Sequence, residues 1–192
     1  MKIKKEVKKY FSSNKKTHKH KLIYLLPLIC LLILIDNLTK YWALKTLYVN
    51  NHSKTIHFIY HFIDFTYVNN PGLAFSSWQN SYIFAILISA FVVFVVLVYF
   101  IITRTKFLAY PLSFIVAGGC GNLINRTWNH GYVSDFIKWG FNSNISFFNA
   151  VFNLADSFIT CGAIAFVVLF IFYLFFWPKI LLKREKQKNA KL

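Results

Sequence analysis

The chain has 192 residues, of which 57% are hydrophobic and 20% aromatic, and its mean hydropathy is positive. This composition excludes an ordinary soluble domain of the same length and is typical of an integral membrane protein. The formal net charge of +16 could indicate nucleic-acid binding, but nine lysines precede Ile23 and six Lys/Arg follow Trp177. Basic tails that flank apolar segments set membrane topology and contact lipid headgroups. We therefore expect membrane lipids, and no nucleic acid, among the partners.

The apolar segments predict an α-helical integral membrane protein with four transmembrane helices. The predicted spans, in chain order, are residues 22–44, 81–103, 107–124 and 152–177. Residues 1–21 and 178–192 are basic tails. A retained first span is favoured over a cleaved signal peptide, because no small-x-small cleavage site follows the apolar run at 22–35.

The two longer loops, 45–80 and 125–151, differ in character from the spans. Residues 56–68 are rich in aromatic and β-branched side chains and are followed at 69–72 by Asn-Asn-Pro-Gly, which indicates one or two strands and a turn. The two longer loops hold four basic residues, whereas the tails and the short loop at 104–106 hold seventeen. The positive-inside rule therefore predicts cytoplasmic tails and extracytoplasmic longer loops.

Polar residues on three spans are predicted to lie at the same depth. At about 1.5 Å per residue, Asp36 and Asn122 lie roughly 21 to 23 Å from the cytoplasmic face of a core about 30 Å thick. Asp156 lies about one turn into the last span from the other side, and Asn153 lies one turn above it. A carboxylate at this depth costs roughly 2.5 to 3.5 kcal/mol, so it normally faces the bundle interior and marks a function. For Asp36, a purely structural pairing with Lys40 at i, i+4 stays open.

Asp135, on the second longer loop, and Asp156 are candidates for a catalytic carboxylate pair. Two carboxyl groups that share a site away from bulk water titrate in two steps, so one can be ionised while the other is protonated at neutral pH. The ionised carboxylate can take a proton from an attacking water, and the protonated carboxyl can polarise a carbonyl, as in aspartic proteases. The pair therefore suggests peptide hydrolysis at the membrane surface.

Five motifs occur in order along the chain: Asp36-Asn-Leu-Thr-Lys40, Asn70-Pro-Gly-Leu-Ala-Phe75, Gly118-Gly-Cys-Gly-Asn-Leu-Ile-Asn-Arg126, Val133-Ser-Asp-Phe136 and Phe152-Asn-Leu-Ala-Asp156. Together they resemble the ordered motif set of the bacterial lipoprotein signal peptidase (signal peptidase II) family. The resemblance covers residues 22–177, and this region would be the catalytic domain. It implies an aspartic endopeptidase, with no metal or other cofactor, that cuts a prolipoprotein before its diacylglyceryl-modified cysteine.

The resemblance also implies roles for individual residues. Asp135 and Asp156 would be the catalytic dyad, and seven residues would line or support the site: Asp36, Lys40, Asn70, Gly72, Asn122, Arg126 and Asn153. The outer loops would form a small extracytoplasmic β-cradle and a short outer helix over the site. The enzyme would lie in the bacterial inner membrane and would be a target of the cyclic peptide globomycin; we expect a monomer.

The chain departs from the family pattern at Asn125, where an aspartate beside Arg126 is usual. A neutral hydrogen bond is therefore expected where the family has a supporting charge pair. The three cysteines, Cys30, Cys120 and Cys161, have no CxxC spacing and are expected to be free thiols.

Other sites and classes are less well supported. His57 and His61 have the spacing of a zinc-binding helix, but no Glu lies between them and their surroundings predict strand. No GxSxG motif indicates a serine nucleophile. A small transporter or proton relay could use Asp36, Asp135 and Asp156, although no inverted repeat is present and these carboxylates cluster at one face. A purely structural membrane subunit would leave the three carboxylates unexplained.

Overall fold

The computed structural model describes residues 16–50, 52–60, 62–72, 82–141 and 149–175. Within these ranges, four helices are long and apolar enough to cross a membrane: Lys16–Leu47, Tyr82–Ile102, Lys106–Trp128 and Leu154–Phe175. Large apolar side chains on α3 (Tyr82–Ile102) face outward, and Phe91 is 67% exposed. Exposure on this scale indicates a lipid-facing surface, since water would not favour it. The expectation of four transmembrane helices is confirmed.

The first helix begins inside the predicted basic tail. Its π-helical turn η1 (Lys21–Leu25) is followed by α2 (Leu26–Leu47), and the helical stretch as a whole starts at Lys16. The Lys21 ammonium donates hydrogen bonds to three carbonyls at the end of α3: Phe100, Ile101 and Thr103. The last carbonyls of a helix have no partner within that helix, so Lys21 satisfies groups that would otherwise stay unpaired. This contact explains why the helix continues into the polar tail.

Helix α4 (Lys106–Trp128) is central and packs against α2, α3 and α6 (Leu154–Phe175). It extends past the predicted end at residue 124 to Trp128. Glycines on α4 permit the closest approaches: a Cβ at Gly118 would lie 2.4 Å from the Ala155 carbonyl oxygen, and one at Gly121 would lie 2.4 Å from Asp36 Oδ2. Small residues at such crossings let helix backbones come together in a membrane. The glycines thus bring α2 and α6 together around α4.

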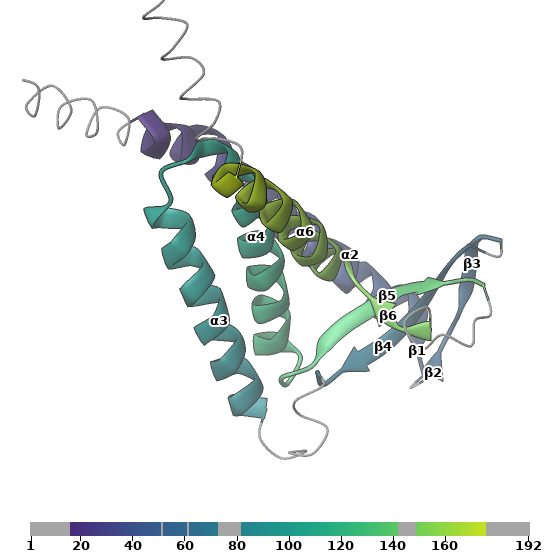
Figure 1. The fold of residues 1–192 in the computed structure, drawn as a ribbon. Helices are drawn as coiled ribbons and strands as arrows, with labels where there is room; N and C mark the ends of the chain where they lie inside the picture. Colours follow the sequence, from purple (N-terminus) through teal and green to yellow (C-terminus); the bar gives the residue numbers. More distant parts are fainter. Residues whose placement is uncertain (1–15, 51, 61, 73–81, 142–148, 176–192) are drawn as a thin grey trace, which may run out of the picture.

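Both longer loops contribute strands, which confirms the small β element. A short hairpin pairs β1 (Tyr48–Val49) with β2 (His52–Ser53). A four-stranded antiparallel sheet has the order β3-β4-β5-β6, formed by β3 (Ile56–Ile59), β4 (Ile63–Asn70), β5 (Val133–Trp139) and β6 (Val151–Phe152). The sheet lies at one end of the helices, which we call the sheet end (Figure 1). The expected short outer helix falls within 125–151, a loop whose residues 142–148 lie outside the described residues.

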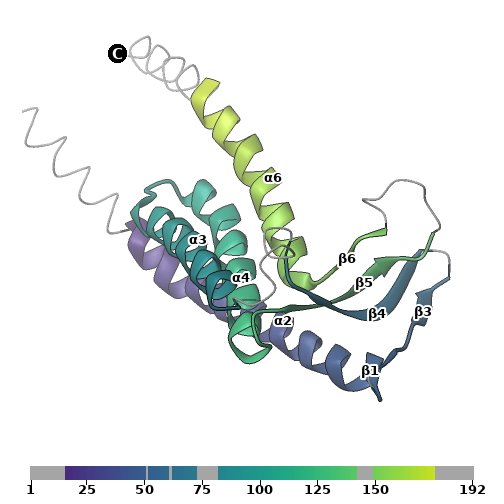
Figure 2. The same cartoon turned by 90° about the horizontal axis from the view of Figure 1, so that it is seen from below.

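The start of the first helix and the end of α6 lie away from the sheet, at the other end of the bundle (Figure 2). Strand β5 joins the two parts of the molecule, because it follows α4 directly and contacts α2 as well as its neighbouring strands. Residues on β5 can therefore meet residues from the helix ends.

Candidate active site

Asp135 lies on β5 and is almost completely buried, with 1% of its surface exposed. Two amides hold its carboxylate: Asn70 Nδ2 donates to Oδ2 over 2.7 Å and Asn153 Nδ2 donates to Oδ1 over 2.6 Å. Asn70 comes from the end of β4, and Asn153 comes from the residue just before α6. Strand and helix therefore clamp the carboxylate from two sides.

Asp156 lies in the first turn of α6, where Asn153 caps the helix. Asn153 Oδ1 accepts a hydrogen bond from the Asp156 backbone N–H over 3.0 Å, and Asp156 Oδ2 accepts one from the Asn153 backbone N–H over 3.1 Å. This reciprocal pattern is a capping box, which satisfies two N–H groups that a helix start leaves unpaired. The helix dipole also favours a negative charge at this end. The local sequence thus fixes the position of Asp156.

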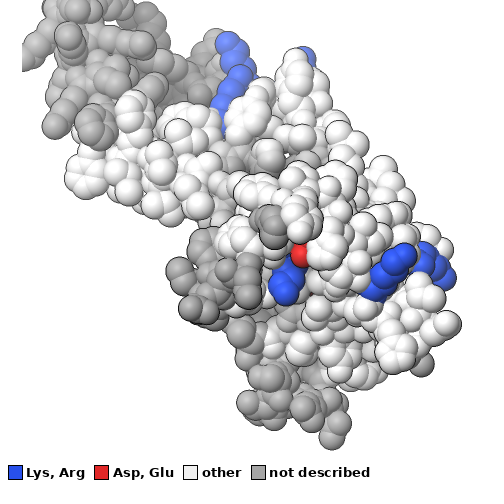
Figure 3. Space-filling model, turned by 90° about the vertical axis from the view of Figure 1, so that its right-hand side faces the viewer, with Lys and Arg blue, Asp and Glu red and all other residues white. Residues whose placement is uncertain are grey.

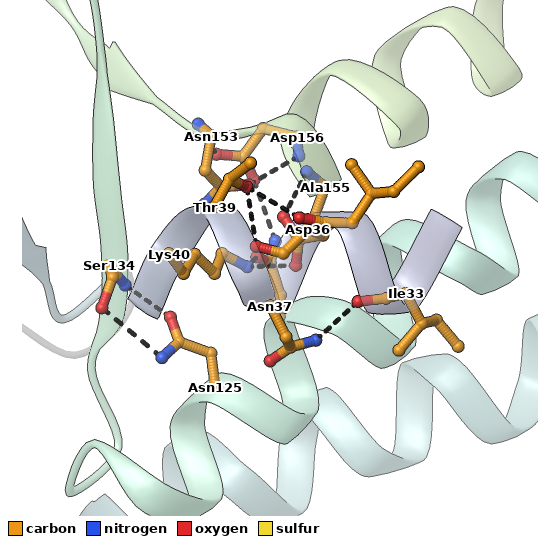
Figure 4. Close-up of polar contacts among 12 residues, drawn as sticks. Ile33, Asp36, Asn37, Thr39, Lys40, Asn125, Ser134, Asn153, Ala155 and Asp156 are labelled. Atoms are coloured by element: carbon orange, nitrogen blue, oxygen red, sulfur yellow. Dashed lines mark hydrogen bonds and ion pairs between the residues drawn. The ribbon is translucent and has the colours of Figure 1, made fainter. Parts of the chain in front are cut away.

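Asn153 links the two carboxylates. Its amide nitrogen donates to Asp135, and its amide oxygen accepts from the backbone of Asp156. Figure 4 shows Asn153 and Asp156 together above α2, with Asp36 below them. The two aspartates are separated by 21 positions in the sequence, yet one side chain touches both.

The environment favours the neutral form of Asp135. Burial, reinforced by the negative charge of Asp156, raises the pKa of Asp135 to about 7, although hydrogen bonds from Asn70 and Asn153 and the charge of Lys40 oppose this shift. A carboxyl with this pKa is protonated in a large fraction of molecules at neutral pH. It can therefore donate a hydrogen bond to a carbonyl oxygen, as one member of a catalytic carboxyl pair must.

Asp36 and Lys40 on α2 form a fully buried ion pair, with 2.7 Å between Lys40 Nζ and Asp36 Oδ2. Asp36 does more than pair, because its Oδ1 accepts a hydrogen bond from the Ala155 backbone N–H at the start of α6 over 2.9 Å. Lys40 also donates to Asn122 Oδ1 over 2.7 Å, and Asn122 Nδ2 donates to Asp156 Oδ1 over 2.9 Å. The pair thus connects α2, α4 and the Asp156 carboxylate.

The remaining sequence-predicted residues lie at the same end of the bundle. Asn70 Oδ1 accepts a hydrogen bond from the Gly72 backbone N–H over 2.7 Å, and Gly72 has a φ of 84°, which favours glycine. Arg126 donates to the Gly131 carbonyl over 2.6 Å, and its guanidinium lies within the electrostatic reach of Asp135 and Asp156. In the contacts described, Gly72 and Arg126 do not touch the carboxyl group of Asp135 or Asp156 directly.

Asn125 makes its neutral hydrogen bond with a partner that the sequence does not indicate. Its Oδ1 accepts from the Ser134 backbone N–H over 2.6 Å. Arg126 is not that partner, because adjacent helix positions project in different directions. Ser134 and the nearby Tyr67, which contacts it, were also missed by sequence analysis. The only available signal was the position of Ser134 next to Asp135.

The sequence alternatives find little support in the structure. His57 Nδ1 lies 2.7 Å from Asp64 Oδ1, and His61 lies outside the described residues. Within the ranges that the structure covers, no group of three or more His, Cys, Asp or Glu could hold a metal ion. Cys30, Cys120 and Cys161 are free, as expected.

The site reaches the molecular surface through Asp156, which is partly exposed whereas Asp135 is buried. Figure 3 shows a face on which a small acidic patch lies directly beside a basic one. Four helices long enough to cross a membrane and a linked pair of carboxyl groups together indicate a multi-pass membrane protein with the groups that aspartic hydrolases use.

The family is shown by comparison with known proteins. The family model described as "Signal peptidase (SPase) II" matches residues 28–173, and the chain belongs to this family of membrane aspartic peptidases. The chain is 41% identical to the lipoprotein signal peptidase of Caldanaerobacter subterraneus subsp. tengcongensis over 147 residues, which covers 76% of the chain and 94% of the relative. It is 37% identical to that of Streptococcus agalactiae, covering 75% of the chain and 90% of the relative.

Solved structures agree with this assignment. Two structures described as bacterial membrane enzymes, obtained by the in meso method at 2.3 and 1.9 Å resolution, are similar to the chain. The match to the first structure has a TM-score of 0.65 and 25% sequence identity, and it covers 79% of this chain and 89% of the matched chain. The match to the second has a TM-score of 0.64 and 27% sequence identity, and it covers 76% of this chain and 91% of the matched chain. The protein is therefore a multi-pass membrane hydrolase.

Proposed function

We propose that this protein removes the signal peptide from diacylglyceryl-modified prolipoproteins by cutting the bond before the lipidated cysteine, with Asp135 and Asp156 as the catalytic dyad. One observation carries the proposal: Asn153 holds the carboxylate of Asp135 and caps the backbone of Asp156 at the same time. Membership of the signal peptidase II family supports the reaction and the substrate class.

The two carboxyl groups take different roles because their surroundings differ. Asp156 lies in the first turn of α6, is partly exposed and accepts a hydrogen bond from Asn122. Asp135 is buried and holds the proton of the pair, in agreement with its pKa of about 7. Asp156 is therefore the general base, and Asp135 polarises the scissile carbonyl.

The proton balance of the reaction follows from these roles. A water attacks the carbonyl carbon while Asp156 takes its proton, and Asp135 gives its proton to the carbonyl oxygen. When the tetrahedral intermediate breaks its C–N bond, the leaving amine takes the proton from Asp156, and the new carboxyl returns one to Asp135. The dyad thus ends with the single proton with which it began.

The supporting residues act by holding the dyad in place. Asp36 binds the start of α6, and Lys40 orients Asn122 toward Asp156. Asn70, with its turn closed by Gly72, holds Asp135 from the sheet side. Arg126 contributes positive charge near the pair. Placement within about 1 Å matters for catalysis, since misplacement on that scale can cost roughly 100-fold in rate.

The topology proposed from the charge distribution fits this site. Residues 22–177 would be the catalytic domain, residues 1–21 and 178–192 would be cytoplasmic tails in contact with lipid headgroups, and the sheet end would face the extracytoplasmic side of the inner membrane. The basic Lys/Arg excess in the tails supports this orientation. We propose a monomer, because one chain supplies both carboxyl groups.

The test is cleavage of a lipid-modified prolipoprotein by the full chain in liposomes. Asp135→Asn and Asp156→Asn, examined separately, are each expected to fold and to lose at least about 1,000-fold in kcat, since each removes a proton-transfer group. Globomycin is expected to inhibit the parent enzyme. Ordinary turnover by either variant would refute the dyad.

A further inference from the structure

A buried polar cluster beside the dyad plays no part in the proposed reaction. It consists of Asn125 on α4, Ser134 on β5 and Tyr67 on β4, with Asn69 and Asn129 at its outer side; we call it the Ser134 network. Asn125 and Ser134 are 0% exposed and Tyr67 is 2% exposed. Buried polar groups of this kind are costly unless every one is hydrogen-bonded. The cluster therefore needs an explanation.

The hydrogen bonds of the network have a definite direction. Asn125 Oδ1 must be the atom that faces the Ser134 backbone N–H, because that group can only donate. The amide nitrogens of Asn125 and Asn129 then donate to Ser134 Oγ over 3.5 and 3.3 Å. With both acceptor positions of its oxygen used, Ser134 donates its own proton to the Tyr67 hydroxyl over 3.0 Å. Tyr67 in turn donates to Asn69 Oδ1 over 2.9 Å.

The network lies at a β-bulge next to Asp135. Phe65 pairs with Ile137, but Val68 pairs with Asp135, so β4 has one extra residue between these pairs, in the stretch that contains Tyr67. Bulges of this kind change the direction of nearby side chains. Successive residues of a strand point to opposite faces, and a slip by one residue would exchange Ser134 with Asp135. The direction of Asp135 thus depends on where Ser134 is held.

We propose that Asn125 is a positioning residue for Asp135, acting through Ser134 and Tyr67 to lock the register of β5 at the bulge; the inference rests on the proposed function of the dyad. Figure 4 shows Asn125 reaching from α4 to Ser134 on the strand. Ser134 and Asp135 are neighbours, so the anchor lies one residue from the carboxylate.

The neutrality of Asn125 has a second effect. The charged and titratable groups that act on Asp135 come from every neighbouring element: Lys40 on α2, Tyr67 on β4, Arg126 on α4 and Asp156 on α6. A carboxylate at position 125 would still accept from the Ser134 N–H but would add a negative charge to this group. It would therefore make the dyad hold its shared proton to higher pH.

The test compares Asn125→Ala, Asn125→Asp and Ser134→Ala in the full chain in liposomes, with a lipid-modified prolipoprotein as the substrate. Asn125→Ala is expected to lower kcat about 10- to 100-fold with KM changed less than about 3-fold, because the dyad is displaced while substrate contacts remain. Asn125→Asp should keep kcat at its optimum within about 5-fold of the parent and move the alkaline limb of its pH profile upward. Ser134→Ala, which keeps the backbone contact, should lose less activity than Asn125→Ala.

The matched control is Asn37→Ala, which removes a partly buried amide of α2 that bonds only to the Ile33 carbonyl in the contacts described. It should keep the kcat of the parent. Unchanged kcat in Asn125→Ala would overturn the proposal. Equal losses of kcat in Asn125→Ala and Asn125→Asp, with the alkaline limb of the Asn125→Asp pH profile unmoved, would overturn it as well. If Asn125→Ala does not fold, the Asn125→Asp pH profile decides. Full activity in Asp135→Asn would instead refute the dyad itself.

Discussion

At the residue scale, single side chains with two contacts hold the site together. Asn153 contacts both aspartates. Asn122 accepts a hydrogen bond from Lys40 and donates one to Asp156. Amides suit this role because each carries a donor and an acceptor in a fixed geometry and adds no charge to a buried carboxylate pair. Asp36 and Lys40 carry opposite charges and form an ion pair with each other.

The pKa of Asp135, about 7, predicts how activity depends on pH. The reaction requires one shared proton, so kcat should fall as the pH rises above about 7. A pH-rate profile in liposomes measures this limb. A rate that is flat from pH 6 to about pH 9 would contradict the assignment of the proton to Asp135.

The raised pKa of Asp135 predicts that the folded state becomes less stable as the pH rises, whereas a carboxylate in an ordinary ion pair makes it more stable. Between the usual aspartate value of 3.8 and about 7, the unfolded chain binds fewer protons than the folded one, so the free energy of unfolding decreases as the pH rises through this window. Asp135→Asn removes the cost of burying the charge. Relative to the parent, the Tm of this variant should therefore rise by a few degrees between pH 4 and pH 8. An equal Tm difference at both pH values would contradict this.

At the element scale, α4 organises the site because its glycines admit two other helices. The crossing at Gly121 brings the Asp36 carboxylate against the α4 backbone, and the crossing at Gly118 does the same for the start of α6. These contacts place Asp36 where it can bind the Ala155 N–H. The carboxyl pair is thus positioned by helix packing as much as by its own hydrogen bonds.

Substitution of the helix glycines tests this role. In Gly121→Ala, the new methyl group would lie 2.4 Å from Asp36 Oδ2, so the Asp36 carboxylate or α2 must shift. We expect a lower Tm and a kcat reduced roughly 10-fold or more, because Asp36 would lose its contacts with Lys40 and the Ala155 N–H. Gly119→Ala is the control, since its methyl group would meet only a Val93 side-chain methyl at 3.0 Å, which can shift. Thermal unfolding in detergent and prolipoprotein cleavage measure both effects. Equal tolerance of the two substitutions would contradict the argument.

At the scale of the whole molecule, the two ends of the bundle have separate tasks. The sheet end carries the carboxyl pair, and the opposite end is closed by Lys21 against the carbonyls of α3. Thr17 adds a hydrogen bond to the Arg104 carbonyl in the turn between α3 and α4. The contacts described for Thr17 and Lys21 therefore stabilise the bundle at a distance from the carboxyl pair.

Lys21→Met should reveal this division of tasks. It leaves three carbonyls at and just past the end of α3 without their donor, so Tm should fall by several degrees, equivalent to about 1 to 3 kcal/mol. The kcat and KM at temperatures well below Tm should stay as in the parent. Lys19→Met, at an exposed position of the same helix, is the control and should change neither quantity. A selective loss of kcat in Lys21→Met would show that the two ends are coupled.

The four spans and the small β element could be predicted from the sequence, which also supplied the candidate residues of the site. Those features follow from local patterns: apolar runs must match the bilayer thickness, and strand and turn residues act over a few positions. Motif spacing also indicated Asp135 and Asp156 as a candidate pair, although no local pattern states that residues 21 positions apart share the contact of Asn153.

Which groups contact one another is settled by long-range packing in the folded chain. In the folded chain, Asp36 bonds to the backbone at the start of α6, and Asn125 bonds to Ser134 on β5 rather than to its neighbour Arg126. The fold also places a bulge beside Asp135, which shifts the register by one residue. These contacts depend on how closely helices approach at glycine and on how two distant strands pair, and both arise from packing between segments that no local sequence pattern specifies.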